Sequence, residues 1–233
     1  MREFGQAEVL FIIFALQWTL TLTALAFVGG GIAGLGVALL RISRSRIIRW
    51  LVSGYIQIVQ GMPLLVLMFL CYYAPSLFGI ELDALFAAGI ALTLNASAFL
   101  GAIWESALRA IPKAQWESAE ALALPQSKVL RFVIAPQAVR IALPSTVGYL
   151  VQIVKETSLA SIIGFVEITR AGQLVSNATF EPMKAFVCVA ILYFVICFPL
   201  SRFSQWLEAR SPGRAKGTSR GKRSIRSKSP KTT

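Results

Sequence analysis

A short polar stretch between two long apolar runs carries the most distinctive chemistry of this 233-residue chain. From residue 117 to residue 136 it reads ESAEALALPQSKVLRFVIAP. One face of the helix predicted at its start carries aromatic and small apolar side chains, at Trp116, Ala119, Leu122 and Ala123. Glu117 and Glu120 point elsewhere. A face of this kind can pack in the cleft of a soluble partner while the glutamates meet basic residues there.

Pro125 divides this stretch into two short helices. Proline suits the first turn of a helix and biases the residue before it away from helical geometry. The pattern therefore predicts a helix, a break, and a second helix from about Gln126 to Val133 that ends before Pro136. The residues alone leave open an alternative, an amphipathic hairpin lying on the membrane surface.

Lys155 and Glu156 form the only ionisable pair deep in an apolar run. Charges inside a bilayer are costly and usually face a cavity or a partner. Two interpretations follow: the pair faces a cavity or a partner, or it is a structural ion pair at the outer interface.

Other reactive groups are scarce. The chain has no histidine, and its three cysteines (Cys71, Cys188 and Cys197) lie in apolar segments with neither metal-ligand nor disulfide spacing. The segment Gly217–Lys222 is one residue short of a phosphate-binding loop, and Arg223 stands where such a loop needs Ser or Thr. We therefore expect no catalytic residues, no metal site, no bound cofactor and no ATPase site in this chain, so it is not expected to be an enzyme.

Composition places the chain among all-α integral membrane proteins. Hydrophobic residues make up 56% of it and charged residues only 15%, against roughly 25% charged residues in soluble domains. The apolar runs are continuous rather than alternating, which favours helices over a barrel. At roughly 20 residues per span, the expected spans are about 18–40, 51–75, 84–104, 141–163 and 185–205.

The two ends of the chain differ from this core. Residues 1–17 are expected to form an uncleaved, partly interfacial lead-in, although the apolar stretch from Val9 to Leu16 also resembles a signal-peptide core. Residues 208–233 are basic and almost free of apolar side chains, which predicts a disordered cytoplasmic tail beside anionic lipid, with nucleic-acid binding as the alternative.

Charge also predicts the direction of the spans. The loop after the first span holds only bases, and the next holds only acids: Arg41, Arg44, Arg46 and Arg49, then Glu81 and Asp83. The positive-inside rule places the N-terminus outside and the C-terminus inside. Small residues recur every four positions along the first span, at Ala26, Gly30, Gly34 and Ala38. They favour close packing inside the bundle over a dimer face.

Four stretches of the sequence together resemble a known family. The cytoplasmic "EAA" loop of ABC importer permeases resembles the stretch PKAQWESAEALALPQSKVLRFVIAPQAVRIALP. The sequence of this stretch is most similar to that of permeases for polar amino-acid uptake (histidine/glutamine permease-like). YIQIVQGMPLLVLMFLCYYAP, ASAFLGAIWESALRAIP and VKETSLASIIGFVEITRAGQ follow the order of that family. The resemblance covers residues 19–207 and implies a type-1 transmembrane domain of about five spans.

The resemblance implies a function and partners. The chain is expected to be a multi-pass permease of the bacterial inner membrane that imports polar amino acids or related amines. It would work with two ATP-binding subunits that hydrolyse the ATP, a second permease, identical or similar, and an extracytoplasmic solute-binding protein. Gln60, Ala102 and Glu105 differ from the residues usual in the family, and this difference favours a pair of different permeases. Lipid is the only other expected partner, and nucleic acid is not expected.

Residues 112–136 would be the coupling loop that seats on the ATP-binding subunit. Glu117, Ser118 and Ala119 occupy the EAA positions. The residues expected to couple are Trp116, Glu117, Ser118, Ala119, Glu120, Ala123, Pro125 and Pro136. Ala123 replaces the family's glycine, and Ala135 replaces a leucine. Because alanine disfavours a positive φ, we expect the turn to depend more on Pro125 and its local shape to differ.

The translocation-path candidates are Gln60, Pro63, Lys155, Glu156, Thr157 and Ser158. The family's Lys-Asp-Thr-Ser-Leu matches residues 155–159 with Glu for Asp, and donors there would suit a zwitterion. Pro63 is expected to kink a helix rather than contact a ligand. Gln60, Ala102 and Glu105 depart from the family's Arg, Glu and Arg, which predicts altered ion pairing between subunits.

Two other classes of membrane protein remain alternatives to an importer permease. A secondary transporter or channel needs coupling carboxylates in its spans, and only Glu156 qualifies. A membrane-embedded enzyme needs convergent catalytic groups, which this sequence does not offer. Neither class needs the polar loop at 112–136.

Overall fold

The computed structural model describes residues 3–123 and 125–210, and within these ranges the regular elements are all helical. The α-helices are α1 (Gln6–Arg41), α2 (Arg46–Gly61), α3 (Leu64–Tyr73), α4 (Ala84–Arg109), α5 (Lys113–Ala121), α6 (Gln126–Lys128), α7 (Ala135–Glu156), α8 (Ile168–Thr179) and α9 (Pro182–Arg210). The 3₁₀ segments η1 (Pro75–Phe78) and η3 (Thr157–Ile163) and the π-helical segment η2 (Val129–Ile134) connect them.

Among the described residues, three helices (α1, α4 and α9) are long and apolar enough to cross a membrane. Two bent pairs raise the number to five: α2 with α3 and η1, bent by 100°, and the segment Val129–Ile163 with α8, bent by 48°. The expected all-α fold of about five spans is confirmed in this form, with the second and fourth spans broken rather than straight.

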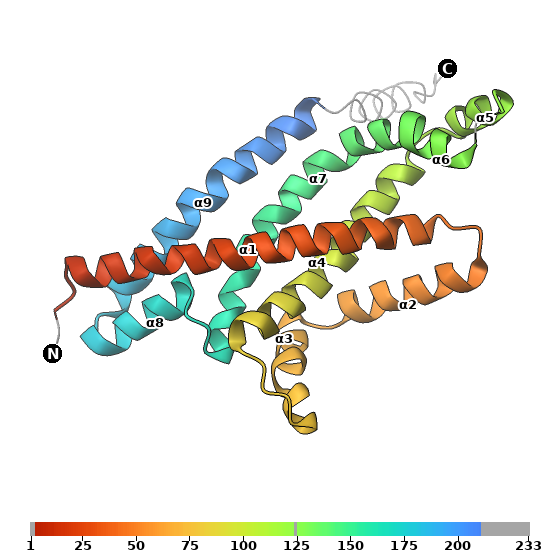
Figure 1. Ribbon diagram of the computed structural model, residues 1–233. Coiled ribbons are helices and arrows are strands. Elements are labelled where there is room, and N and C mark those ends of the chain that lie inside the picture. Colours follow the sequence, from red (N-terminus) through yellow and green to blue (C-terminus); the bar gives the residue numbers. More distant parts are fainter. Residues whose placement is uncertain (1–2, 124, 211–233) are drawn as a thin grey trace, which may run out of the picture.

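The break in the second span lies at Pro63, as the sequence predicts. Met62 has φ −96° and ψ 140°, an extended conformation, and α3 starts directly after the proline. Proline disfavours helical geometry in the residue before it and has no N–H for the helical ladder. The chain therefore turns here, and α3 runs across the direction of α2 (Figure 1).

The first helix starts earlier than the sequence analysis places the first span. It begins at Gln6 instead of about residue 18 and runs without interruption to Arg41. No glycine or proline interrupts residues 6–28, and the Glu8 carboxylate accepts the Gly5 N–H at 3.0 Å. Ile12 and Ala15 are buried in a cluster with residues of α8 and α9. Residues 6–17 therefore belong to the helical bundle.

Helices α1 and α4 cross in very close contact. Ala26, Gly30, Gly34 and Ala38 are all buried. A Cβ placed on Gly30 would lie 2.4 Å from the Ala96 Cβ, and one on Gly34 would lie 3.0 Å from the Gly101 nitrogen. The small residues thus serve packing inside the chain, which confirms the favoured interpretation.

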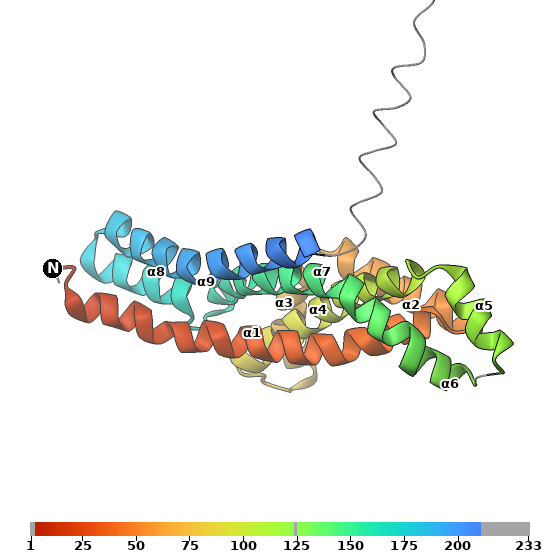
Figure 2. The same cartoon turned by 90° about the horizontal axis from the view of Figure 1, so that it is seen from above.

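Functional elements separate between the two ends of the molecule. The α1–α2 turn, α5 and α6 gather at one end, and the N-terminal end of α1 and α8 lie at the other (Figure 1, Figure 2). The basic α1–α2 turn and the polar loop therefore share an end, as the charge pattern requires. The direction of this end relative to the membrane stays a prediction.

The α1–α4 contact yields a matched pair of variants. Gly30→Ala should destabilise the protein by about 1–3 kcal/mol, because the added methyl group overpacks the contact with Ala96. Gly31→Ala should be neutral or slightly stabilising, because its Cβ meets no atom within 4 Å. Thermal unfolding in detergent measures both. Ala96→Gly should partly rescue Gly30→Ala, and equal melting temperatures for the two single variants would contradict the assignment.

Candidate functional site

The predicted coupling loop is a helix, a turn and a second helix. The backbone N–H groups of Lys128 and Val129 donate to the Pro125 carbonyl oxygen at 2.8 and 3.1 Å, so the second helix starts at the proline. It does not end at Val133. Instead it passes through the π-helical segment η2 directly into α7, near whose start Pro136 lies. Widened π-helical turns are rare and occur mostly as short segments inside α-helices, and here they precede a residue that cannot donate a backbone hydrogen bond.

Ala123 keeps a left-handed backbone in the turn, with φ +55°. An L-residue in this region carries a steric cost of roughly 1–2 kcal/mol that glycine avoids. The substitution of the expected glycine therefore does not abolish the left-handed geometry. Leu124 lies outside the described residues.

The structure divides the residues of the predicted coupling loop into an inner and an outer set. Ala119 is 4% exposed, and Trp116 is half-buried. Both pack on an apolar cluster of their own chain, here called the loop-base cluster: Ala38, Ala107, Leu108, Ile111, Val129, Ile134, Ala138 and Ala142. The outer set, available to a partner, is Glu117, Ser118, Ala121, Leu122, Ala123, Pro125 and, beyond η2, Pro136. The side chain of Glu120 lies outside the described part.

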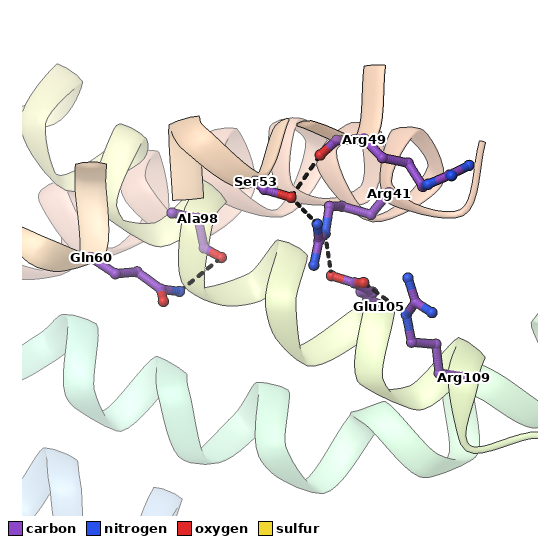
Figure 3. A network of polar contacts seen from close by, with 7 residues as sticks. All are labelled: Arg41, Arg49, Ser53, Gln60, Ala98, Glu105 and Arg109. Atoms are coloured by element: carbon purple, nitrogen blue, oxygen red, sulfur yellow. Dashed lines mark hydrogen bonds and ion pairs between the residues drawn. The ribbon is translucent and has the colours of Figure 1, made fainter. Parts of the chain in front are cut away.

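Directly beneath this loop, Glu105 is buried between two arginines (Figure 3). The Arg41 Nε lies 2.7 Å from Oε2, and the Arg109 Nε lies 2.8 Å from Oε1. Arg41 also donates from Nη1 to the Ser53 hydroxyl, which in turn donates to the Arg49 carbonyl oxygen at 2.6 Å. One carboxylate therefore connects α1, α2 and α4 at the end that carries the coupling loop. The cations that neutralise Glu105 come from its own chain, and its pairing needs no second subunit.

Gln60 points toward α4, where its Nε2 donates to the Ala98 carbonyl oxygen at 3.2 Å (Figure 3). It also lines a cavity of about 420 Å³ together with Ala102, Ser106 and Ser145. The small Ala102 side chain leaves space beside the amide. The predicted candidate Gln60 thus faces a partly polar cavity between α2, α4 and α7, one turn before the bend at Pro63.

Glu156 lies in a polar cluster at the end of α7. Asn95 Nδ2 donates to one carboxylate oxygen and Gln152 Nε2 to the other, each at 3.2 Å. Asn95 also donates to the Tyr149 hydroxyl at 3.1 Å. Sequence analysis missed Asn95, although a lone amide in an expected span is itself a signal of function.

The neighbours of Glu156 differ in their exposure. Lys155 is exposed and forms no ion pair within the described part of the chain, so the alternative of a Lys155–Glu156 pair is not what the structure contains. Thr157 is buried and donates to the Val154 carbonyl oxygen at 2.7 Å. Ser158 is half-buried and donates to the Lys155 carbonyl oxygen at 2.7 Å. Of the predicted donors, Lys155 is therefore the one whose polar group is free to meet a solute.

Sequence analysis also missed a buried carboxylate, that of Glu167. Glu167 is fully buried and caps α8, where it accepts the N–H groups of Thr169 and Arg170 at 2.9 and 2.8 Å. The Tyr193 hydroxyl of α9 donates to it at 2.9 Å. An acidic residue directly before a helical pattern is a known capping signal, and it could have identified this role.

Comparison with known proteins decides the family. Residues 26–211 match the family described as "Binding-protein-dependent transport system inner membrane component". The chain belongs to this family. It is thus a multi-pass inner-membrane permease, and the matched region includes the predicted coupling loop, the Glu105 network and the Glu156 cluster.

Curated relatives of this permease share about a third of its residues. The probable amino-acid ABC transporter permease YckA of Bacillus subtilis is 32% identical, with 86% of this chain and 88% of that protein covered. The L-cystine transport system permease TcyB of the same species is 34% identical, with 84% of each covered. The nopaline transport system permease NocM of Agrobacterium fabrum is 33% identical, with 89% and 92% covered.

Solved structures agree with the fold. A crystal structure of an amino acid ABC transporter with histidines superposes with a TM-score of 0.80 at 32% identity, and it covers 86% of this permease and 94% of that chain. The inward-facing MetNI methionine ABC transporter superposes with a TM-score of 0.71 at 19% identity, with 88% of this permease and 99% of that chain covered. At that identity the second likeness concerns the fold alone.

Removing the Glu105 carboxylate tests the network in Figure 3. Glu105→Gln should cost about 1.5–3 kcal/mol of stability, because Arg41 then lies half-buried without its counter-ion. Arg109→Gln should cost less than about 1 kcal/mol, since that side chain is 58% exposed. Thermal unfolding in detergent compares the two. A larger loss for Arg109→Gln would show that burial does not determine the strength of this network.

Proposed function

We propose that this permease forms the translocation path of an ATP-driven, binding-protein-dependent importer for polar amino acids or related amines. The names of its relatives support this substrate class. Two separate ATP-binding subunits supply the energy, a solute-binding protein delivers the substrate, and a second permease, identical or similar, completes the path. This chain binds no cofactor and catalyses no covalent step. The observation that carries the proposal is the exposed coupling loop on a buried apolar base.

The loop is built to transmit force. Its outer face presents Glu117 and Leu122, the latter 74% exposed, to a partner. Its inner face, through Ala119, packs on the loop-base cluster, whose members come from α1, α4, η2 and α7. The second helix continues into α7 through η2. A push on α5 therefore reaches α7 through the backbone and α4 through packed side chains, and a rigid chain of contacts of this kind can couple distant sites.

The path itself runs beside α4 and α7. Gln60 and its cavity lie toward the coupling end, and the Glu156 cluster lies at the far end of α7. At that end an acid and a free base are adjacent in sequence. A zwitterionic solute presents an ammonium group and a carboxylate, which Glu156 and Lys155 would complement.

The docking role is tested on the outer face alone, because replacing the buried Ala119 would disturb the fold. Glu117→Lys combined with Leu122→Glu should abolish co-purification of the ATP-binding subunit from native membranes in mild detergent, while the permease stays folded. Glu81→Lys is the matched control, an exposed charge reversal in the α3–α4 loop. Unchanged co-purification of the double variant, identified by mass spectrometry, would contradict docking through α5 and leave ion-coupled transport through Glu156 as the rival.

The path is tested by solute uptake into proteoliposomes that contain the assembled transporter. Glu156→Gln keeps the shape of the side chain and removes its charge. It should weaken apparent substrate affinity by about 10–100-fold, because a hydrogen bond to a charged group contributes about that much to binding. Lys155→Ala should act in the same direction. Glu181→Gln, in a surface ion pair at the α8–α9 turn, should change neither affinity nor rate. Wild-type kinetics for both path variants would exclude this cluster from the path.

A further inference from the structure

A groove outside the translocation path runs between α1, α4 and the start of α7. It encloses about 300 Å³ and is lined mainly by apolar side chains, among them Leu35, Leu39, Trp104, Leu108, Leu130 and Ala138. Polar groups border it only where η2 and α6 begin, at Ser127 and Arg131. The groove is thus an apolar slot with a hydroxyl and a guanidinium group at one end.

Arg131 has no counter-ion among the side chains that the structure describes. Its side chain is exposed and forms no ion pair within the described part of the chain. Its guanidinium group lies near the Phe132 ring, with the Cζ atom 5.5 Å from the ring centroid. The Glu105 carboxylate pairs with Arg41 and Arg109 instead. The charge at the mouth of the groove is therefore available to an anion.

The walls of the groove come from segments that are candidates for crossing the bilayer. Leu35 and Leu39 belong to α1, which is long and apolar enough to span a membrane, and Ala138 belongs to the segment Val129–Ile163, which meets that criterion together with α8. On α1 the apolar face continues outward, with Ile32 73% and Leu35 45% exposed. Arg131 lies two residues after the start of that segment. An occupant that matches the lining is therefore apolar along Leu35 and Leu39 and anionic beside Arg131.

We propose that this groove is a binding site for an anionic phospholipid. One acyl chain lies along Leu35, Leu39 and Trp104, and the headgroup phosphate accepts hydrogen bonds from Arg131 and Ser127. Guanidinium groups match phosphate geometry, and basic pockets between membrane helices bind acidic headgroups. The assignment depends on α1 and α7 lying in the bilayer and is independent of the transported solute. Its consequence is that a lipid braces η2, the segment that joins the coupling loop to α7.

Trp104 lines the groove and can report on its occupant. The full-length chain is reduced to this tryptophan by replacing Trp18, Trp50, Trp116 and Trp206 with Phe, and is reconstituted with phospholipids brominated on the acyl chains. Brominated phosphatidylglycerol should bind at the groove, and quench Trp104, with about a fivefold preference over brominated phosphatidylcholine. Arg131→Gln should remove this preference. Arg140→Gln, an exposed arginine of α7 outside the groove, should keep it.

Native mass spectrometry of the wild-type chain and of Arg131→Gln gives a second reading that does not need the tryptophan replacements. The wild type should retain a phosphatidylglycerol that Arg131→Gln loses. Equal quenching by both lipids, unchanged by Arg131→Gln, would show only bulk lipid at the groove and overturn the proposal. Shielding of Trp104 from both lipids would show that protein covers the groove, and would overturn it equally.

Discussion

The close approach of α1 and α4 is the contact on which the rest of the structure depends. Lipid tails are as apolar as leucine, so two helices in a bilayer gain little from hiding apolar area and must instead gain from close packing. Gly30 and Gly34 bring the α1 backbone directly onto α4. The same alignment brings Arg41 within 2.7 Å of Glu105 at one end of the contact. Helix α4 also contacts α2, α3 and α7.

Three embedded carboxylates show how the chain separates structural charge from functional charge. Glu105 is neutralised by two arginines, and Glu167 accepts two backbone N–H groups and a tyrosine hydroxyl. Glu156 receives only two amide donors and has no cationic partner among the described residues. An ion held by neutral dipoles alone keeps its attraction for a mobile cation. Glu167 is also held by neutral donors, but it is fully buried, whereas Glu156 is half-buried. We therefore propose Glu156, rather than Glu105 or Glu167, as the carboxylate that meets a transported ammonium group.

The sequence predicts what depends on local chemistry. Proline at 63 and at 125 predicts the two breaks, and small residues spaced by four predict the helix contact at Gly30 and Gly34. Features that depend on distant partners are missed. Glu105 lies 64 positions from Arg41, so its departure from the family pattern suggests a partner in another subunit. In the same way, the helical face of Ala119 has the composition of a docking surface, but η2 and α4 cover it from within the chain.

The coupling loop combines strain and rigidity in a way that suits its proposed role. Ala123 holds a left-handed conformation that costs free energy, and a strained turn persists only where its surroundings fix it. On one side Ala119 is anchored in the loop-base cluster, and on the other Val129 and Ile134 are anchored in the same cluster. The two helices that flank the turn are therefore held by one common base and cannot swing independently. A loop that flexed freely would absorb the motion of the proposed ATP-binding subunit, whereas a loop anchored in this way would pass the motion to α4 and α7.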